Sequence, residues 1–361
     1  MTNVANDTNT SDGGVNHVIA GDRGLPEANV IAVAGLGLIG GSLARRLVAR
    51  GRKVIAWNHR PHPYGQARAA GINCVERIED LALAKPDVLV LCTPLKAMPQ
   101  VLASIAPVLE PHTTLTDVGS VKGQVRDEVE AAGLGACYVG AHPMAGSEFS
   151  GYDASSPDLY DDALWAVTVD ADTDYERFLT VADMICEGVG DRIIVLDDDT
   201  HDQAAAMISH MPHVVSTALA NELTDMPARN IAQALAAGCW RDMTRVALTD
   251  PDRTRAMVEE DAANVAELLR HMSRRLSDMA GLLESGGDAA ASGIRGFFST
   301  AQPYRDFKAR QRSGDVVHDE VRLSLGEGTW REDLLASAKR GEHVIRFDGR
   351  RTAVAQVRTA L

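Results

Sequence analysis

One short stretch in the middle of the chain has the composition of a rigid loop around a histidine. It reads GAHPMAGSEFSG, so that His142 precedes Pro143 and lies among Gly140, Gly146 and Gly151. Pro143 favours an extended backbone at His142, while the glycines allow turns or the close approach of a ligand. Because imidazole titrates near neutral pH, His142 is a candidate catalytic acid or base. The alternative is a histidine that is merely hydrogen-bonded within a tight loop.

A glycine-rich turn nearer the N-terminus has the pattern of a dinucleotide-binding site. An apolar run at residues 29–34 predicts a buried strand, GLGLIG follows it directly, and a helix-forming segment and a second apolar run at 53–57 come next. In this context the first glycine permits a tight turn, the second lets a pyrophosphate approach the backbone, and the third lets the helix pack on the strand. A tight turn without a ligand is the alternative. The expected cofactor-binding residues are Gly35, Leu36, Gly37, Leu38, Ile39 and Gly40.

The end of the second strand bears on the choice of cofactor. An acidic residue there would accept hydrogen bonds from the adenosine ribose and repel a 2′-phosphate. The chain has Asn58, His59 and Arg60 instead. A neutral amide near a guanidinium can receive that phosphate, so we expect NADP in preference to NAD. The alternative is that Arg60 is a solvated loop charge.

Polar residues also follow the later strands of the predicted parallel sheet. Thr93 and Pro94 end one apolar run, and Asp117, Ser120 and Lys122 follow the next one. Ligands bind beyond the carboxyl ends of parallel strands, so these residues are expected near the cofactor, with Thr93, Pro94 and Ser120 as candidate contacts. Ser120 could also hydrogen-bond a substrate hydroxyl or the candidate histidine. Capping of the next helix is the alternative for Ser120 and the favoured role for Asp117.

Strand signals end near residue 197, and helical periodicity then dominates. In this half, SHMPH places His210 and His213 three residues apart on one helix face, with Pro212 between them. Such a pair can ligate a metal, but no further ligand motif such as HExxH or CxxC lies nearby. We therefore expect no metal site, and we favour substrate contact or a structural polar cluster.

A second segment of the helical half, GCWRDMTR, carries two arginines four residues apart. A guanidinium binds a carboxylate through two parallel hydrogen bonds, so Arg241 and Arg245 are candidate ligands for an acidic substrate. Surface ion pairing is the alternative for either arginine alone.

The composition restricts the classes of partner. The formal charge of −14 argues against a general nucleic-acid binder or a protein of anionic membranes, because phosphate contacts need a surplus of Lys and Arg. No apolar run is long enough to span a membrane, the N-terminus lacks signal-peptide features, and the five cysteines include no CxxC pair. We expect a cytoplasmic protein with reduced thiols.

The predicted organisation is that of an α/β protein with a second, all-α domain. Residues 1–28 are polar and predicted to be disordered, and residues 29–197 are predicted to form a doubly wound Rossmann domain. Residues 198–314 are predicted to form a helical substrate and dimerisation domain, which points to a homodimer. Residues 315–361 are predicted to form a small strand-helix-strand-strand appendage with no assigned role.

Five motifs occur in one order between about residues 29 and 310. They are VAGLGLIGGSL, DVGSVKG, AHPMAGSEFSG, SHMPH and GCWRDMTR. Together they resemble the prephenate and arogenate dehydrogenase family of tyrosine biosynthesis, and the combination is far more specific than any single motif. The resemblance implies a Rossmann domain, a helical dimerisation domain, an NAD(P) cofactor, and prephenate or arogenate as the small-molecule substrate.

The resemblance also implies roles for individual residues. His142 would interact with the ring hydroxyl of the substrate, and Ser120 would support His142. His213 would lie at the substrate side chain, and Arg245 would bind a substrate carboxylate. Glu148 would lie near the entrance of the site.

Two departures and two alternatives accompany this resemblance. Many NAD-using relatives carry an acidic residue where this chain has Asn58, and the tail looks too short for the regulatory ACT domain of some relatives. Among enzymes, the runner-up is a β-hydroxyacid dehydrogenase, but such enzymes rely on a helix lysine and the second half has none before Lys308. Outside enzymes, the alternative is a nucleotide-sensing protein. The motifs are compatible with either prephenate or arogenate.

Overall fold

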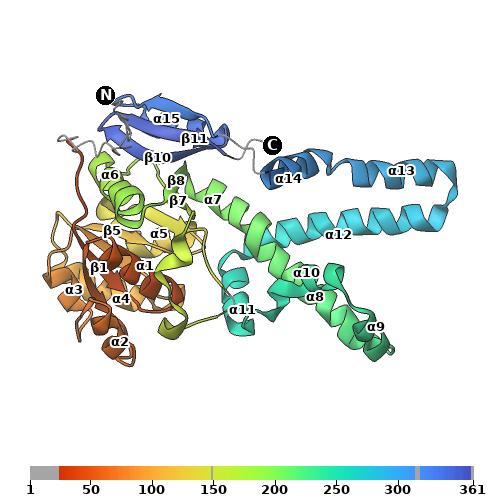
Figure 1. Cartoon of the computed structure of the whole chain (residues 1–361), viewed down its shortest axis with the longest axis horizontal. Helices are drawn as coiled ribbons and strands as arrows, with labels where there is room; N and C mark the ends of the chain where they lie inside the picture. Colours follow the sequence, from red (N-terminus) through yellow and green to blue (C-terminus); the bar gives the residue numbers. More distant parts are fainter. Residues whose placement is uncertain (1–23, 148, 314–317, 359–361) are drawn as a thin grey trace, which may run out of the picture.

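The computed structural model describes residues 24–147, 149–313 and 318–358. Figure 1 shows an α/β body from which a long arm of helices extends to one side. Both the fold class and the change from strands to helices near residue 197 agree with the sequence prediction.

The first sheet is parallel, and it has five strands in the order β3-β2-β1-β4-β5. Alternate residues of the central strand face two separate cores: Ile31 and Val33 lie in one, Ala32 and Ala34 in the other. Burial on both faces explains why β1 and β4 are continuously apolar. The strands are β1 (Val30–Ala34), β2 (Lys53–Trp57), β3 (Asn73–Cys74), β4 (Val88–Leu91) and β5 (Thr114–Asp117).

Helices cover both faces of this sheet. The helices α1 (Leu38–Ala49) and α2 (Tyr64–Ala69) contribute to one core, whereas α3 (Glu79–Leu83), α4 (Met98–Ile105) and α5 (Gly123–Ala131) contribute to the other. Short 3₁₀ turns flank them at η1 (Leu95–Ala97), η2 (Ala106–Val108) and η3 (Gly135–Cys137).

The second sheet is mixed and contains six strands in the order β6-β7-β8-β10-β11-β9. A single parallel bridge, Leu115 to Tyr138, connects its beginning to the first sheet. The strands β7 and β8 are parallel, and every other pair is antiparallel. The six are β6 (Gly140–Pro143), β7 (Leu164–Thr168), β8 (Arg192–Leu196), β9 (Glu320–Ser324), β10 (Glu342–Gly349) and β11 (Thr352–Val357).

The second sheet changes two interpretations of the sequence. First, His142 lies in strand β6, paired with Ala166, and not in a loop; the loop begins only after Pro143. Second, the predicted tail elements exist, with helix α15 (Trp330–Lys339), but β10 pairs with β8. The tail therefore extends the sheet of the N-terminal domain and is not an independent appendage.

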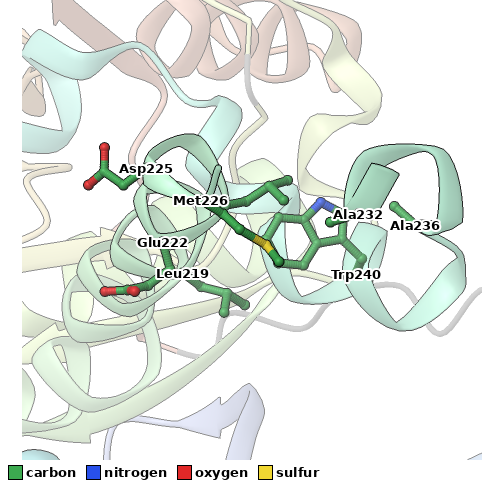
Figure 2. A pocket seen from close by; sticks show the side chains of 8 residues that line it. Leu219, Glu222, Asp225, Met226, Ala232, Ala236 and Trp240 are labelled. Carbon is green, nitrogen blue, oxygen red and sulfur yellow. The ribbon is translucent and has the colours of Figure 1, made fainter. Parts of the chain in front are cut away.

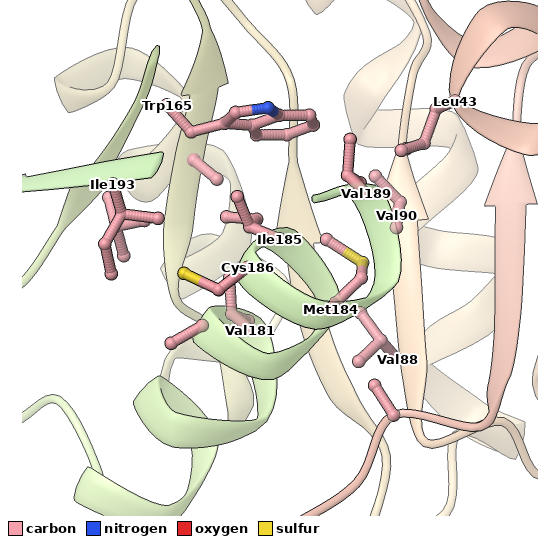
Figure 3. Close-up of a cluster of buried hydrophobic side chains, with 14 of the residues drawn as sticks. Leu43, Val88, Val90, Trp165, Val181, Met184, Ile185, Cys186, Val189 and Ile193 are labelled. Atoms are coloured by element: carbon pink, nitrogen blue, oxygen red, sulfur yellow. The ribbon is translucent and has the colours of Figure 1, made fainter. Parts of the chain in front are cut away.

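A π-helical turn fills the space between the two sheets. Helix α6 (Tyr175–Asp183) continues into the π-helical segment η6 (Met184–Val189). Figure 3 shows Met184 and Ile185 in one apolar cluster with Val88 of β4 and Trp165 of β7. The 3₁₀ turns η4 (Tyr152–Ala154) and η5 (Pro157–Tyr160) both pack against α1.

The described chain begins before the predicted boundary at residue 29. The backbone amide of Ala28 donates to Asp183 Oδ2 at 2.9 Å, and Ala28 is fully buried. The carbonyl of Gly24 accepts a hydrogen bond from Arg350 at 2.9 Å. Residues 24–28 are thus attached to α6 and to the tail, although their polar composition predicted disorder.

The second half of the chain is helical as far as Ser313. Large apolar side chains on these helices are exposed, for example Leu235 at 78% and Leu248 at 82%. Among the described residues, no helix is both long and apolar enough to cross a membrane. The helical elements are α7 (Asp198–Ala205), η7 (Ala206–His210), α8 (Met211–Asp225), α9 (Arg229–Leu235), α10 (Gly238–Thr244), η8 (Arg245–Leu248), α11 (Pro251–Glu260), α12 (Ala262–Ser285), α13 (Gly287–Ser299) and α14 (Gln302–Ser313).

Candidate active site

The glycine turn after β1 has the geometry of a dinucleotide cradle. Gly35 has φ +116°, and a Cβ atom on Gly40 would lie 2.7 Å from Cβ of Cys92, so both positions exclude a side chain. By contrast, a Cβ atom on Gly37 would meet no atom within 4 Å. Gly37 is the N-cap of the twelve-residue helix α1, whose first turn carries no acidic residue. The open backbone at the positive end of a helix suits a pyrophosphate.

Asn58 is attached to this turn by its own side chain. Its Oδ1 accepts from the backbone amide of Leu36 at 2.9 Å, and its Nδ2 donates to the carbonyl of Arg60 at 2.8 Å. The side chain therefore holds the glycine turn at the end of β2. His59 and Arg60 themselves are exposed. Thr93 follows Cys92, the residue that contacts both Gly35 and Gly40, so the predicted cofactor residues lie along one edge of the first sheet.

His142 is hydrogen-bonded to a second histidine that the sequence analysis did not select. Its Nδ1 lies 3.0 Å from Nε2 of His201 in α7, and the rings meet edge to face at 70°. The other ring nitrogen of His201, Nδ1, lies 2.7 Å from Oδ1 of Asp202. Desolvation is the main cause that holds the pKa of His142 well below its usual value, and electrostatic interactions with His201 and Lys122 act in the same direction. His142 is consequently neutral at pH 7 and able to accept a proton.

A buried ion pair fixes strand β6 beneath this histidine. Lys122 and Asp117 are fully buried, and the Lys122 ammonium donates to both Asp117 Oδ2 and the carbonyl of Ala141, the latter at 2.8 Å. The hydroxyl of Tyr138 and the amide of Ala141 both donate to Asp117 Oδ1, at 2.8 and 3.2 Å. Asp117 was expected to cap the next helix, but its carboxylate instead connects β5 to β6 and so positions His142.

The amino end of α5 is held by Asp202. Its two carboxylate oxygens accept from the backbone amides of Lys122 and Gly123, at 2.7 and 3.0 Å. These bonds and the His201 contact outweigh desolvation and lower the pKa of Asp202. Ser120 lies just before this point and is partly exposed, and the described residues include no hydrogen bond between Ser120 and His142.

The two histidines of SHMPH have different environments. His210 is fully buried, and its Nδ1 lies 2.7 Å from Oδ2 of Asp261. His213 is partly exposed, and its Nδ1 lies 3.1 Å from the carbonyl of Val246. Desolvation is the main cause that lowers the pKa of His213. Within the described ranges, no three His, Cys, Asp or Glu side chains are arranged to hold a metal ion.

The structure separates the two candidate arginines. Arg245 immediately precedes Val246, the residue whose carbonyl contacts His213, and its positive charge contributes to lowering the pKa of that histidine. The side chain of Arg241 is 79% exposed and lies 3.5 Å from Asp242 in a surface ion pair. Of the two arginines, only Arg245 therefore adjoins the residue that contacts His213 and acts on the pKa of that histidine. Glu148 lies outside the described residues.

Arg253 connects the helical domain to the segment after β6. It donates to the carbonyls of Ser147 and Phe149, at 2.8 and 3.2 Å. Its charge also acts on His213. Neither Arg253 nor the pair of His201 and Asp202 belongs to the motifs singled out in the sequence, because their roles come from contacts with distant segments.

A separate apolar hollow lies in the helical domain. It has a volume of about 580 Å³ and is lined by residues of α8, α9 and α10 and of the segments that join them. Figure 2 shows Trp240 and Met226 at its centre, with Leu219 beside them. None of the predicted site residues lines it, so the hollow is distinct from the histidine cluster.

Two family models match successive parts of the chain. Residues 43–195 match the nucleotide-binding domain of prephenate dehydrogenase, and residues 197–291 match its dimerisation domain. The chain belongs to the prephenate dehydrogenase family. It is an oxidoreductase of that type, and the resemblance inferred from the five motifs is confirmed.

Individual relatives agree with this assignment. The cyclohexadienyl dehydrogenase of Zymomonas mobilis is 32% identical over 246 residues, which cover 67% of this chain and 84% of that protein. The structure of Aquifex aeolicus prephenate dehydrogenase with hydroxyphenyl propionate and NAD+ has a TM-score of 0.69 and 27% identity, covering 77% of this chain and 97% of that one. Synechocystis arogenate dehydrogenase has a TM-score of 0.67 and 27% identity, covering 77% and 99%.

Proposed function

We propose that this protein oxidises and decarboxylates prephenate to 4-hydroxyphenylpyruvate, with His142 as the proton acceptor. The observation that carries the proposal is a histidine kept neutral at the end of β6, with Nδ1 bonded to His201 and Nε2 bonded to no described residue. A neutral imidazole with a free nitrogen is the group needed to remove a hydroxyl proton at pH 7.

The substrate is a cyclohexadienol with a carboxylate on the ring carbon opposite the hydroxyl group. A nicotinamide dinucleotide held at the glycine turn supplies the hydride acceptor for the hydroxyl-bearing carbon. His142 accepts the hydroxyl proton as that carbon becomes a carbonyl. Loss of the ring carboxylate as CO₂ then makes the ring aromatic, so the overall reaction is effectively irreversible.

The remaining site residues position the dianionic substrate. Arg245 binds a carboxylate, since its side chain is exposed to an incoming ligand and its charge acts on His213. His213 contacts the substrate side chain, and Ser120 contacts the ring hydroxyl. Glu148 is assigned to the entrance of the site. Each well-positioned contact is worth on the order of a few kcal/mol in binding or orientation.

For the cofactor we propose a preference for NADP. Asn58 replaces the acidic residue that would repel a 2′-phosphate, and the exposed guanidinium of Arg60 follows two residues later. The related Aquifex aeolicus enzyme is bound to NAD+ in its structure, so NAD is the competing assignment. Arg60→Ala should raise KM for NADP at least tenfold and leave KM for NAD nearly unchanged.

We also assign a homodimer to this chain. The second family model is described as a dimerisation domain, and the helices that match it expose Ile231, Leu235, Leu276 and Leu283. Apolar side chains of this size are normally buried against another surface in a stable protein. Light scattering after size-exclusion chromatography should give twice the 38.6 kDa chain mass; a monomer at micromolar concentration contradicts this assignment.

One assay tests substrate and cofactor together. Initial rates are measured with prephenate or arogenate and with NAD or NADP, and reduced nicotinamide is followed by absorbance. The expected result is turnover of prephenate, faster with NADP. Turnover of arogenate alone would support the second candidate, arogenate dehydrogenase, which the Synechocystis neighbour favours. If the cofactor binds but neither substrate is turned over, the proposed reaction is rejected and only the fold assignment is kept.

A further inference from the structure

Three side chains form a continuous hydrogen-bonded row behind the proposed proton acceptor. The row runs from Asp202 through His201 to His142, with separations of 2.7 Å and 3.0 Å. His201 is 2% exposed, so water does not compete for these bonds. The row joins α7 of the helical half to β6 of the second sheet, 59 residues apart in the sequence.

The carboxylate determines which nitrogen of each ring carries a proton. Asp202 is ionised, because its pKa is lowered and it accepts two backbone amides. An ionised carboxylate only accepts hydrogen bonds, so Nδ1 of His201 must be the protonated nitrogen. When His201 is neutral, its Nε2 is therefore an acceptor, and Nδ1 of His142 must donate to it. Nε2 of His142 is then left as the basic nitrogen.

We infer that His201 is a positioning residue and proton relay that holds His142 in the Nδ1–H form and receives its displaced proton. The inference rests on the proposed function, in which His142 accepts the hydroxyl proton. As the O–H bond of the substrate breaks, a new N–H bond forms at Nε2 of His142. The Nδ1–H proton of His142 moves to Nε2 of His201, and His201 keeps its own Nδ1–H. One positive charge is thus displaced from His142 to His201, and no other reactant is needed.

The surrounding charges favour this displacement. The buried ammonium of Lys122 acts on His142 and disfavours a second positive charge there, and so does His210 from η7. Asp202 lies directly beside His201 and stabilises an imidazolium on that ring. Asp117 is neutralised by Lys122, and Asp198 by Arg126, so Asp202 is the carboxylate in hydrogen-bond contact with the row.

The tautomer of His142 can be determined without substrate. Full-length protein labelled with ¹⁵N-histidine is measured by long-range ¹H–¹⁵N NMR at pH 7, and the His142 signals are assigned from the spectrum of His142→Asn. Histidine in water favours the Nε2–H form, so protonation at Nδ1 of His142 is the specific expectation. In His201→Asn the shorter side chain can still reach Asp202 but not His142. The His142 signals should then change to the Nε2–H form.

Kinetics test the relay. His201→Asn should lower kcat by roughly tenfold to one hundredfold, within the range of a weakened general base. The acid limb of its pH profile should also move, because His142 then takes up its proton without the hydrogen bond from its Nδ1–H to Nε2 of His201. His201→Gln offers an amide oxygen to Nδ1–H of His142 but cannot take its proton, so it should restore the tautomer and only part of kcat.

The matched control is His343→Gln in β10. His343 is also buried, at 4% exposure, but belongs to the tail strands, so its replacement should change neither the pH profile nor the His142 signals. An Nε2–H form of His142 in the wild-type protein would overturn the inference. So would an unchanged tautomer and acid limb in His201→Asn. If the wild-type protein does not turn over prephenate or arogenate, the proposed function fails, while the NMR result still decides the tautomer.

Discussion

The buried pair of Asp117 and Lys122 gives the sharpest test of how the site is held. Asp117→Asn keeps the size of the side chain but removes its charge. Lys122 is 0% exposed, so its ammonium would remain in the interior without a counterion. The neutral amide also has only one oxygen for the four groups that now donate to the carboxylate: the amides of Gly119 and Ala141, the hydroxyl of Tyr138 and the ammonium.

The magnitude follows from this burial. Removing one partner of a buried ion pair costs about 3–5 kcal/mol, mostly because the other charge stays desolvated. The double variant Asp117→Asn, Lys122→Met leaves no unpaired charge and should be less destabilised than the sum of the two single variants. The cycle should show that the double variant is at least about 1 kcal/mol less destabilised than the sum of the two single variants.

The assay is urea unfolding followed by circular dichroism, with kcat measured on each folded variant. An exposed pair supplies the control: Lys85 and Glu110 lie 3.0 Å apart, with side chains 64% and 39% exposed. Glu110→Gln should change the free energy of unfolding by no more than about 1 kcal/mol. If Asp117→Asn costs as little as this control, the ion pair does not hold β6, and the account of how His142 is positioned fails.

Three further predictions concern the site and the core. His142→Asn should leave cofactor binding intact and lower kcat by roughly two to four powers of ten; near-normal turnover in the same assay would remove His142 from the mechanism. Arg245→Gln should raise KM for the substrate much more than it lowers kcat, because the guanidinium contributes to binding; an unchanged KM would reassign the carboxylate to Arg241. Burial raises the pKa of Asp191 to about 6. The folded protein therefore binds more protons than the unfolded chain between about pH 4 and 6, and its stability falls as the pH rises through that window. Asp191→Asn keeps the acceptor for Trp165 and should remove this decline. The free energy of unfolding of the variant, measured in urea at pH 7, should therefore be about 1–2 kcal/mol higher than that of the wild-type protein. If the stability of Asp191→Asn falls as steeply with pH as that of the wild-type protein, a group other than Asp191 causes the decline.

The sequence by itself determined the local elements and the family. The bounds of β2 were predicted to the residue, because apolar periodicity and flanking breakers act over a few positions. The glycine fingerprint likewise depends on local backbone geometry, and the structure gives Gly35, Gly37 and Gly40 the three environments it requires. Helix ends were less accurate. Helix α1 begins at Leu38, inside the glycine fingerprint, although Gly40 and Gly41 in its first turn have low helix propensity.

Tertiary structure alone decided how distant segments combine around His142. Nothing in the local pattern indicates that β10 should pair with β8 or that Asp117 should bind Lys122 rather than cap a helix. The same holds for His201, whose contact with His142 joins two segments that are unrelated in periodicity. The sequence around a histidine does not show whether its ring contacts solvent, a carbonyl group or another imidazole. Its protonation depends on burial and on charges supplied by other elements, and only the folded chain brings those together.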